Sequence, residues 1–225
     1  MAKLINLISF AILFGGFMQY LYHLLKCLKK GEAKTCYSHD IYISSDEKYM
    51  AVDCSGLVDF WLQKEYPLAR AEIFDYILQV RDIVKYKITR LYSFDFYDFF
   101  QYIKENSSDN WQFVDVEKKL AKGDILAFIN PARKGRWGHV AVVEQEISRD
   151  DEKIVLKVID STTYKHFEDW HQSDDMGIGS GIIELYKDKG KLVKVCYGPN
   201  CMRVRDVCAG CLKKMKKNKK KCLII

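Results

Sequence analysis

The chain reads YMAVDCSGLVDFWL at residues 49–62, where an extended segment passes into an amphipathic helix. Asp53 is a good helix N-cap, and Leu57 and Trp61 lie on one apolar stripe of the helix that follows. Cys54 would then sit in the first turn, where the helix dipole and free backbone N–H groups favour a thiolate. Cys54 is therefore a candidate nucleophile, with a small buried residue as the alternative.

Three extended segments follow further along the chain. They are KKLAKGDILAF at 118–128, which holds a turn before its strand, GHVAVVEQ at 138–145 and IVLKVID at 154–160. His139 begins the second segment and Asp160 ends the third, so two adjacent antiparallel strands would bring them side by side. This arrangement gives the thiol a general base and gives the base an orienting carboxylate. The alternatives are a core histidine and a turn aspartate.

The ordered motifs DCSGLV, GDILAF, GHVAVV and VIDST resemble the NlpC family of papain-like cysteine peptidases and amidases, whose relatives include CHAP amidases and lecithin:retinol acyltransferases. The resemblance covers about Tyr49 to Tyr197. It implies an α+β, papain-like (NlpC-type) fold, in which a helix carrying the nucleophilic cysteine packs on an antiparallel sheet. By motif, Cys54 is the nucleophile, His139 the base and Asp160 the third member, a place where many relatives have histidine.

A second group of residues is expected to line the cleft or support the site: Asp53, Tyr49, Ser161 and His166. Residues 160–183 resemble a bacterial subgroup in which DST precedes a histidine and a Gly-Ile-Gly-x-Gly turn. This resemblance implies that His166 and the loop to Gly181 border the cleft; a solvated polar loop is the alternative. We expect no cofactor and no metal, because the polar residues here match no standard metal-ligand spacing.

The sequence predicts three parts. They are an apolar N-terminal helix at 1–30, an NlpC-type domain at 31–202 with a helical insertion at 63–117, and a Cys/Lys-rich tail at 203–225.

Apolar residues at helical spacing predict helices at 69–86 and 93–105 within the insertion. The second of these is strongly aromatic. Its rings would form core, or else line a groove for an acyl chain or a peptide.

The N-terminal segment from Leu4 to Leu25 carries no formally charged residue, and as a helix it would span roughly 33 Å. A membrane anchor, a signal peptide and a helix packed on the domain all fit. The lysines that follow outnumber Lys3, so an anchor would leave the domain on the cytoplasmic side.

The C-terminal residues read KKMKKNKKKCLII, in which Cys222 begins a C-a-a-X pattern after a lysine run. A prenyl group on Cys222 and the lysines would together bind an anionic membrane leaflet. The net charge of +6 is concentrated at the two ends of the chain, around an acidic middle. This distribution favours a membrane partner and argues against nucleic acid.

The chain contains 8 cysteines, which leave several pairings open. Cys196 and Cys201 could form one bridge, and Cys208 and Cys211 a second. The same four thiols could instead hold zinc.

The sequence thus predicts a membrane-associated cysteine hydrolase or acyltransferase that acts on an amide, ester or thioester of a peptide or lipid substrate. Prenylation occurs in eukaryotic cytosol, so this prediction describes a bacterial or viral effector on the cytoplasmic face of a host membrane. The alternatives are an exported cell-wall peptidase that hydrolyses peptidoglycan, and a non-catalytic membrane adaptor.

Overall fold

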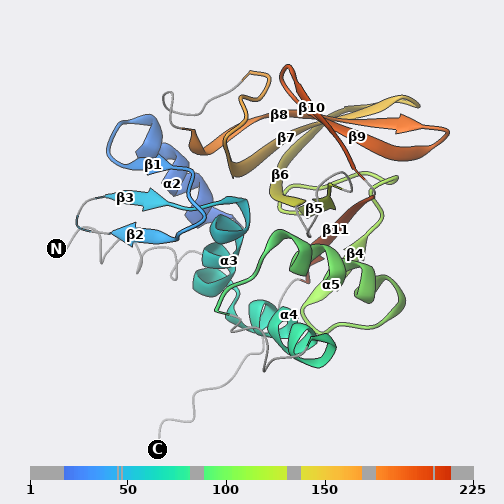
Figure 1. The fold of residues 1–225 in the computed structure, drawn as a ribbon, viewed down its shortest axis with the longest axis horizontal. Coiled ribbons are helices and arrows are strands. Elements are labelled where there is room, and N and C mark those ends of the chain that lie inside the picture. Colours follow the sequence, from blue (N-terminus) through green and yellow to red (C-terminus); the bar gives the residue numbers. More distant parts are fainter. Residues whose placement is uncertain are drawn as a thin grey trace, which may run out of the picture.

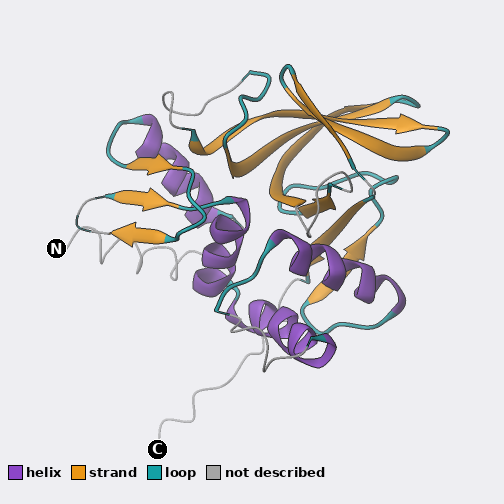
Figure 2. Ribbon diagram, viewed as in Figure 1, coloured by secondary structure: helices purple, strands orange, loops and turns teal. Residues whose placement is uncertain are grey.

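A computed structural model describes residues 18–44, 46, 48–81, 89–130, 138–168, 176–204 and 206–213 (Figure 1). This part of the chain has an α+β fold, in which four helices accompany a large antiparallel sheet and a small sheet (Figure 2). The helices are α2 (Gln19–Lys29), α3 (Cys54–Glu65), α4 (Pro67–Val80) and α5 (Ser93–Glu105).

The large sheet has eight strands in the order β10-β9-β8-β7-β6-β5-β11-β4, and each neighbouring pair is antiparallel. Its strands are β4 (Trp111–Val114), β5 (Ile125–Ile129), β6 (Gly138–Arg149), β7 (Lys153–Thr162), β8 (Gly177–Asp188), β9 (Lys191–Tyr197), β10 (Asn200–Arg203) and β11 (Val207–Leu212). The strands predicted at 125–128, 138–145 and 154–160 are therefore confirmed, and all three extend further.

The small sheet has the order β1-β3-β2, from β1 (Lys34–Cys36), β2 (Tyr42–Ser44) and β3 (Tyr49–Ala51). Strand β3 leads through two residues into α3, so the extended entry and the helix predicted from residues 49–62 are both present.

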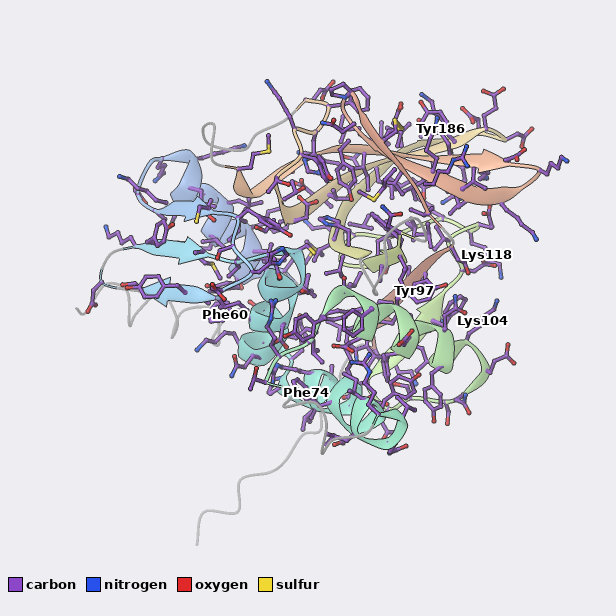
Figure 3. All side chains as sticks on the ribbon, in the orientation of Figure 1. Phe60, Phe74, Tyr97, Lys104, Lys118 and Tyr186 are labelled. Atoms are coloured by element: carbon purple, nitrogen blue, oxygen red, sulfur yellow. A yellow bond between two sulfur atoms is a disulfide. The ribbon has the colours of Figure 1, made fainter. Side chains whose placement is uncertain are left out.

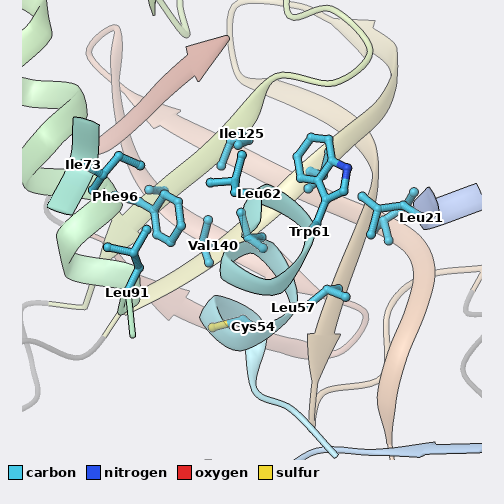
Figure 4. Close-up of a cluster of buried hydrophobic side chains, with 14 of the residues drawn as sticks. Leu21, Cys54, Leu57, Trp61, Leu62, Ile73, Leu91, Phe96, Ile125 and Val140 are labelled. Atoms are coloured by element: carbon cyan, nitrogen blue, oxygen red, sulfur yellow. The ribbon is translucent and has the colours of Figure 1, made fainter. Parts of the chain in front are cut away.

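Strands β5 and β6 bury side chains on both faces of the large sheet, because alternate residues point in opposite directions. One core cluster contains Ile125, Val140 and Val142 together with residues of all four helices. A second cluster contains Leu126, Ala141 and Val143. Figure 4 shows the first cluster, with Leu57 and Trp61 of α3 near Val140 of β6. The α3 helix is thereby fixed against the strand that carries His139.

The two predicted insertion helices are present as α4 and α5. Helix α4 begins at Pro67 and ends at Val80, earlier than the predicted 69–86 at both ends, whereas α5 covers 93–105 as predicted. Proline is favoured at the first helical position because its missing N–H has no partner there in any case. The rings of α5 are core, since Phe96, Phe99 and Phe100 are buried.

The predicted tail at 203–225 requires a correction. Residues Val207–Leu212 form β11, which pairs with β5 on one side and β4 on the other. Five of these six residues are buried, so this segment belongs to the central sheet and not to an appendage. Residues 214–225, including Cys222, lie outside the described residues.

Helix α2 packs on the body through Leu21, Leu25 and Leu28, and the Tyr20 amide donates to Glu65 at 3.0 Å. Within the described ranges, no helix is both long enough and apolar enough to cross a bilayer. Most of the apolar segment on which the anchor and signal-peptide interpretations rest, residues 1–17, is outside those ranges.

Candidate active site

The first turn of α3 is built as the sequence predicts. Asp53 is the N-cap in an extended conformation, and its carboxylate accepts a hydrogen bond of 2.7 Å from the Gly56 amide. Helix α3 begins at Cys54, which is 5% exposed (Figure 4). The nucleophile candidate therefore lies at the positive end of a helix, on the side that faces the core.

His139 and Asp160 meet where strands β6 and β7 lie side by side. The His139 Nε2 atom is 2.6 Å from Asp160 Oδ2, and both side chains are buried. The charge of Cys54 acts on the same imidazole, so the thiol lies near this ring. Because Nε2 is occupied by Asp160, Nδ1 is the ring atom available to the thiol. The structure thus brings together all three residues that the sequence predicts to be catalytic.

The charges around His139 determine its protonation. Burial alone would lower the pKa of His139, but the Cys54 charge, the hydrogen bond that the ring donates to Asp160 and the Asp160 charge raise this pKa to about 10. At neutral pH the ring is therefore an imidazolium with both nitrogens protonated. Such a ring holds a proton for a leaving group and stabilises a neighbouring thiolate.

A second histidine contacts the same carboxylate. His166 Nε2 is 3.3 Å from Asp160 Oδ2, and the His166 side chain is fully buried. His166 can pack here because Gly181 has no side chain; a Cβ at Gly181 would lie 2.4 Å from the His166 Cβ. His166 therefore lies against Asp160, where it can support the site, and residues 169–175 of the loop to Gly181 lie outside the described residues. Gly181 is part of strand β8.

Two other residues that were expected to line the cleft or support the site make structural contacts. Ser161 is fully buried and donates a hydrogen bond of 2.6 Å to the Val52 carbonyl, so it ties β7 to the entry of α3. The Tyr49 hydroxyl lies 2.7 Å from Cys36 Sγ, within the small sheet. The sequence suggested these two residues only because they lie close to a motif. Closeness along the chain does not show where a side chain points.

The sequence analysis did not identify two tyrosines near the thiol. Tyr197 makes edge contacts with both histidines, at ring distances of 5.4 Å to His139 and 5.0 Å to His166. Burial, followed by the Asp160 and Cys54 charges, raises the pKa of Tyr197 well above its ordinary value. Burial and the Cys54 charge likewise raise the pKa of Tyr37. Both tyrosines are therefore neutral, and they enclose the thiol without adding charge.

Arg90 is a further residue that no motif marked. Its guanidinium donates to both carboxylate oxygens of Asp53, at 2.9 and 2.8 Å. His39 also contacts this carboxylate, at 3.1 Å. Burial would raise the pKa of Asp53, but the hydrogen bonds from Arg90 and Gly56 and the Arg90 charge lower it. Asp53 is thus a buried, ionised cap, which supports the site through the first turn of α3.

A cavity of about 280 Å³ lies on the face of α3 that is opposite Cys54. The residues of α3 that line it recur at positions i, i+3, i+4 and i+7, whereas Cys54 belongs to the core-facing stripe. Its lining residues are Ile41, Gly56, Asp59, Phe60, Gln63, Arg70, Thr89 and Arg90 (Phe60 is labelled in Figure 3). We therefore do not assign this cavity to the substrate of Cys54.

The cysteine pairing is partly resolved. Cys196 and Cys201 form a disulfide across the β9–β10 hairpin, as one predicted alternative has it. Cys208 and Cys211 are free thiols on β11, so the second predicted bridge is wrong. The disulfide consumes two of the four thiols that the zinc alternative requires.

The three central side chains form a nucleophile, a base and an orienting carboxylate, which together can carry out acyl transfer. The chain matches no protein-family model, no curated protein and no solved structure in comparisons with each of these collections.

Proposed function

We propose that this protein is a cysteine hydrolase or acyltransferase with a papain-like, NlpC-type domain, in which Cys54 attacks the carbonyl of an amide, ester or thioester. The observation that carries the proposal is the placement of Cys54 at a helix N-terminus near the His139 imidazole, which is hydrogen-bonded to Asp160.

In the proposed reaction, the thiolate forms a bond to the carbonyl carbon, and the tetrahedral oxyanion that results collapses with loss of the leaving group. His139 gives its proton to the leaving amine, alcohol or thiol, and an acyl thioester on Cys54 remains. Water or a second acceptor then attacks this thioester while His139 accepts its proton; the C–S bond breaks, which releases the acid or the transferred acyl product and restores the Cys54 thiolate. Asp160 keeps the imidazole oriented throughout.

Site-selective alkylation tests the nucleophile. At about pH 6, substoichiometric iodoacetamide should label Cys54 before the other free cysteines, because the imidazolium keeps the thiol reactive as a thiolate. Peptide mapping by mass spectrometry gives the label at each position. Cys208→Ala is the matched control, since burial raises the pKa of that thiol to about 12.

Loss of labelling in Cys54→Ala, with labelling unchanged in Cys208→Ala, is the expected result. A label spread over Cys36, Cys54 and Cys211 in the wild type, all of them free thiols, would remove Cys54 from the mechanism.

A second function, peptide-bond hydrolysis in a bacterial cell envelope, is favoured by one observation. The Cys196–Cys201 disulfide is typical of proteins from oxidising compartments, whereas the predicted prenylation at Cys222 requires a reducing cytosol. Release of new amines from peptidoglycan peptides by the wild type, and not by Cys54→Ala, would favour the envelope substrate. The membrane effector and the adaptor stay as predictions, and catalysis by Cys54 would exclude the adaptor.

A further inference from the structure

The N-cap of α3 creates an electrostatic problem for the nucleophile. Asp53 is ionised and buried, one residue before Cys54. The positive end of a helix favours an anion, but here two anions share it: the Asp53 carboxylate and the Cys54 thiolate. Like charges in one site disfavour each other. A reactive Cys54 therefore requires a cation that neutralises Asp53.

Arg90 is the group placed to do this. It makes a two-point contact with the Asp53 carboxylate, and the two side chains are only 14% and 5% exposed. A planar guanidinium matches both carboxylate oxygens at once, which an ammonium does not. His39 also contacts Asp53, but its side chain is 58% exposed, so solvent screens its charge.

The position of Arg90 is fixed from the start of α5. The next residue, Leu91, is fully buried, and the Arg90 guanidinium lies 4.4 Å from the centre of the Tyr92 ring. Tyr92 is itself the N-cap of α5, and its amide is held by Asp95 at 2.7 Å. Arg90, which lies 37 residues after Asp53 in the sequence, is thus anchored at the start of a second helix and contacts the cap of α3.

We propose that Arg90 is a positioning residue for Cys54, which neutralises the Asp53 cap so that the helix terminus stabilises the thiolate. The inference rests on the proposed function, because it concerns the same nucleophile. It explains why an anionic cap can stand directly before a catalytic thiol.

Other groups around the thiol do not replace Arg90. His139 of β6 faces Cys54 and is engaged by Asp160. Tyr37 and Tyr197 also face it and are neutral, because burial raises both pKa values. The charge at the α3 side of the thiol is therefore set by the pair of Asp53 and Arg90, with the exposed His39 at its edge.

The test is the pH dependence of Cys54 alkylation by iodoacetamide in the full chain, measured by peptide mapping. We expect Arg90→Gln to move the midpoint of the profile upward by about one pH unit, which is about a tenfold slower reaction near pH 6. Arg90→Lys keeps the charge and should recover most of the wild-type profile. Thermal unfolding of each variant checks that it is folded.

The double variant Asp53→Asn/Arg90→Gln separates charge from structure. Like Arg90→Gln it lacks the ion pair, but unlike Arg90→Gln it has no uncompensated carboxylate at position 53. We expect its midpoint to lie closer to the wild type than that of Arg90→Gln. A purely structural ion pair predicts the opposite, with the double variant as impaired as the single one. If Arg90→Gln does not fold, Arg90→Lys and the double variant still make this comparison against the wild type.

The outcomes also separate this inference from the function. A wild-type Cys54 that reacts no faster than Cys36 at pH 6 would overturn the nucleophile assignment, and this inference with it. A reactive wild type whose profile coincides with that of Arg90→Gln would overturn the role of Arg90 alone.

Discussion

At His139, burial and charge act in opposite directions, and charge prevails. The ring is removed from water, which favours its neutral form, yet Cys54 and Asp160 hold the proton on it and raise its pKa to about 10. In the unfolded chain an ordinary histidine has lost this proton at pH 7 and above. The His139 ring therefore carries a proton in the folded state that it lacks in the unfolded state between about pH 6.5 and 10.

This difference links the stability to pH. Taken alone, His139 would make the free energy of unfolding fall as the pH rises from about 7 to about 8.5, with a slope of up to about 1.4 kcal/mol per pH unit, and the proton that the proposed Cys54 thiolate gives up on folding would offset this slope. Above about pH 9 cysteine thiols such as Cys208, whose ordinary pKa is 9.0, add their own slope, so the lower window isolates His139.

Cys54→Ala removes the thiolate, and Asp160 still raises the pKa of His139 in this variant. Denaturant unfolding of Cys54→Ala and of Cys54→Ala/His139→Gln across that window therefore measures the effect. His23→Gln in the Cys54→Ala background, at an exposed histidine of α2, is the matched control and should keep the slope of Cys54→Ala. Equal slopes in Cys54→Ala and in Cys54→Ala/His139→Gln would show that His139 does not hold the extra proton.

The sequence could predict the three central residues because each belongs to a local pattern: a helix start, a strand start and a strand end. It could not predict Arg90, which reaches Asp53 across 37 residues and lies in no motif. Nor could it predict Tyr197, because its contacts with two histidines depend on how β9 packs beside β8. Long-range side-chain pairs are set by tertiary packing, which periodicity does not report.

Among the elements, β11 departs most from the sequence prediction. The lysines and cysteines of residues 203–225 suggested an appendage, but the segment VCAGCL at 207–212 has no charge and inserts between β5 and β4. Its small residues matter because α5 lies directly on it. A Cβ at Gly210 would lie 2.3 Å from the ring of Phe100, which is fully buried.

Gly210→Ala should therefore destabilise the fold by about 2–3 kcal/mol, as overpacking of a core typically does. Denaturant unfolding at neutral pH measures the change. The compensating variant is Gly210→Ala/Phe100→Leu, in which the smaller side chain leaves room for the new methyl group. Its free energy of unfolding should exceed the value expected from adding the two single changes. Simple additivity would mean that α5 and β11 are not in contact as described.

For the whole molecule, two features give opposite indications of compartment. The hairpin disulfide Cys196–Cys201 is typical of an oxidising compartment, whereas the predicted prenylation motif at Cys222 is typical of a cytosolic protein. Neither alters the chemistry of the central site, which is built from residues of α3, β6 and β7. The reaction of the proposed enzyme and its compartment are therefore separate questions, and the first can be addressed with purified protein.

The most direct measurement is the mass of the protein after brief incubation with an activated acyl ester and an acid quench. A covalent mechanism predicts one acyl group per chain, mapped to Cys54 as a thioester that hydroxylamine removes. Cys54→Ala should show no adduct, and Cys36→Ala should behave as the wild type. An unmodified wild type, or an equal adduct in Cys54→Ala, would contradict the claim that Cys54 is the catalytic nucleophile.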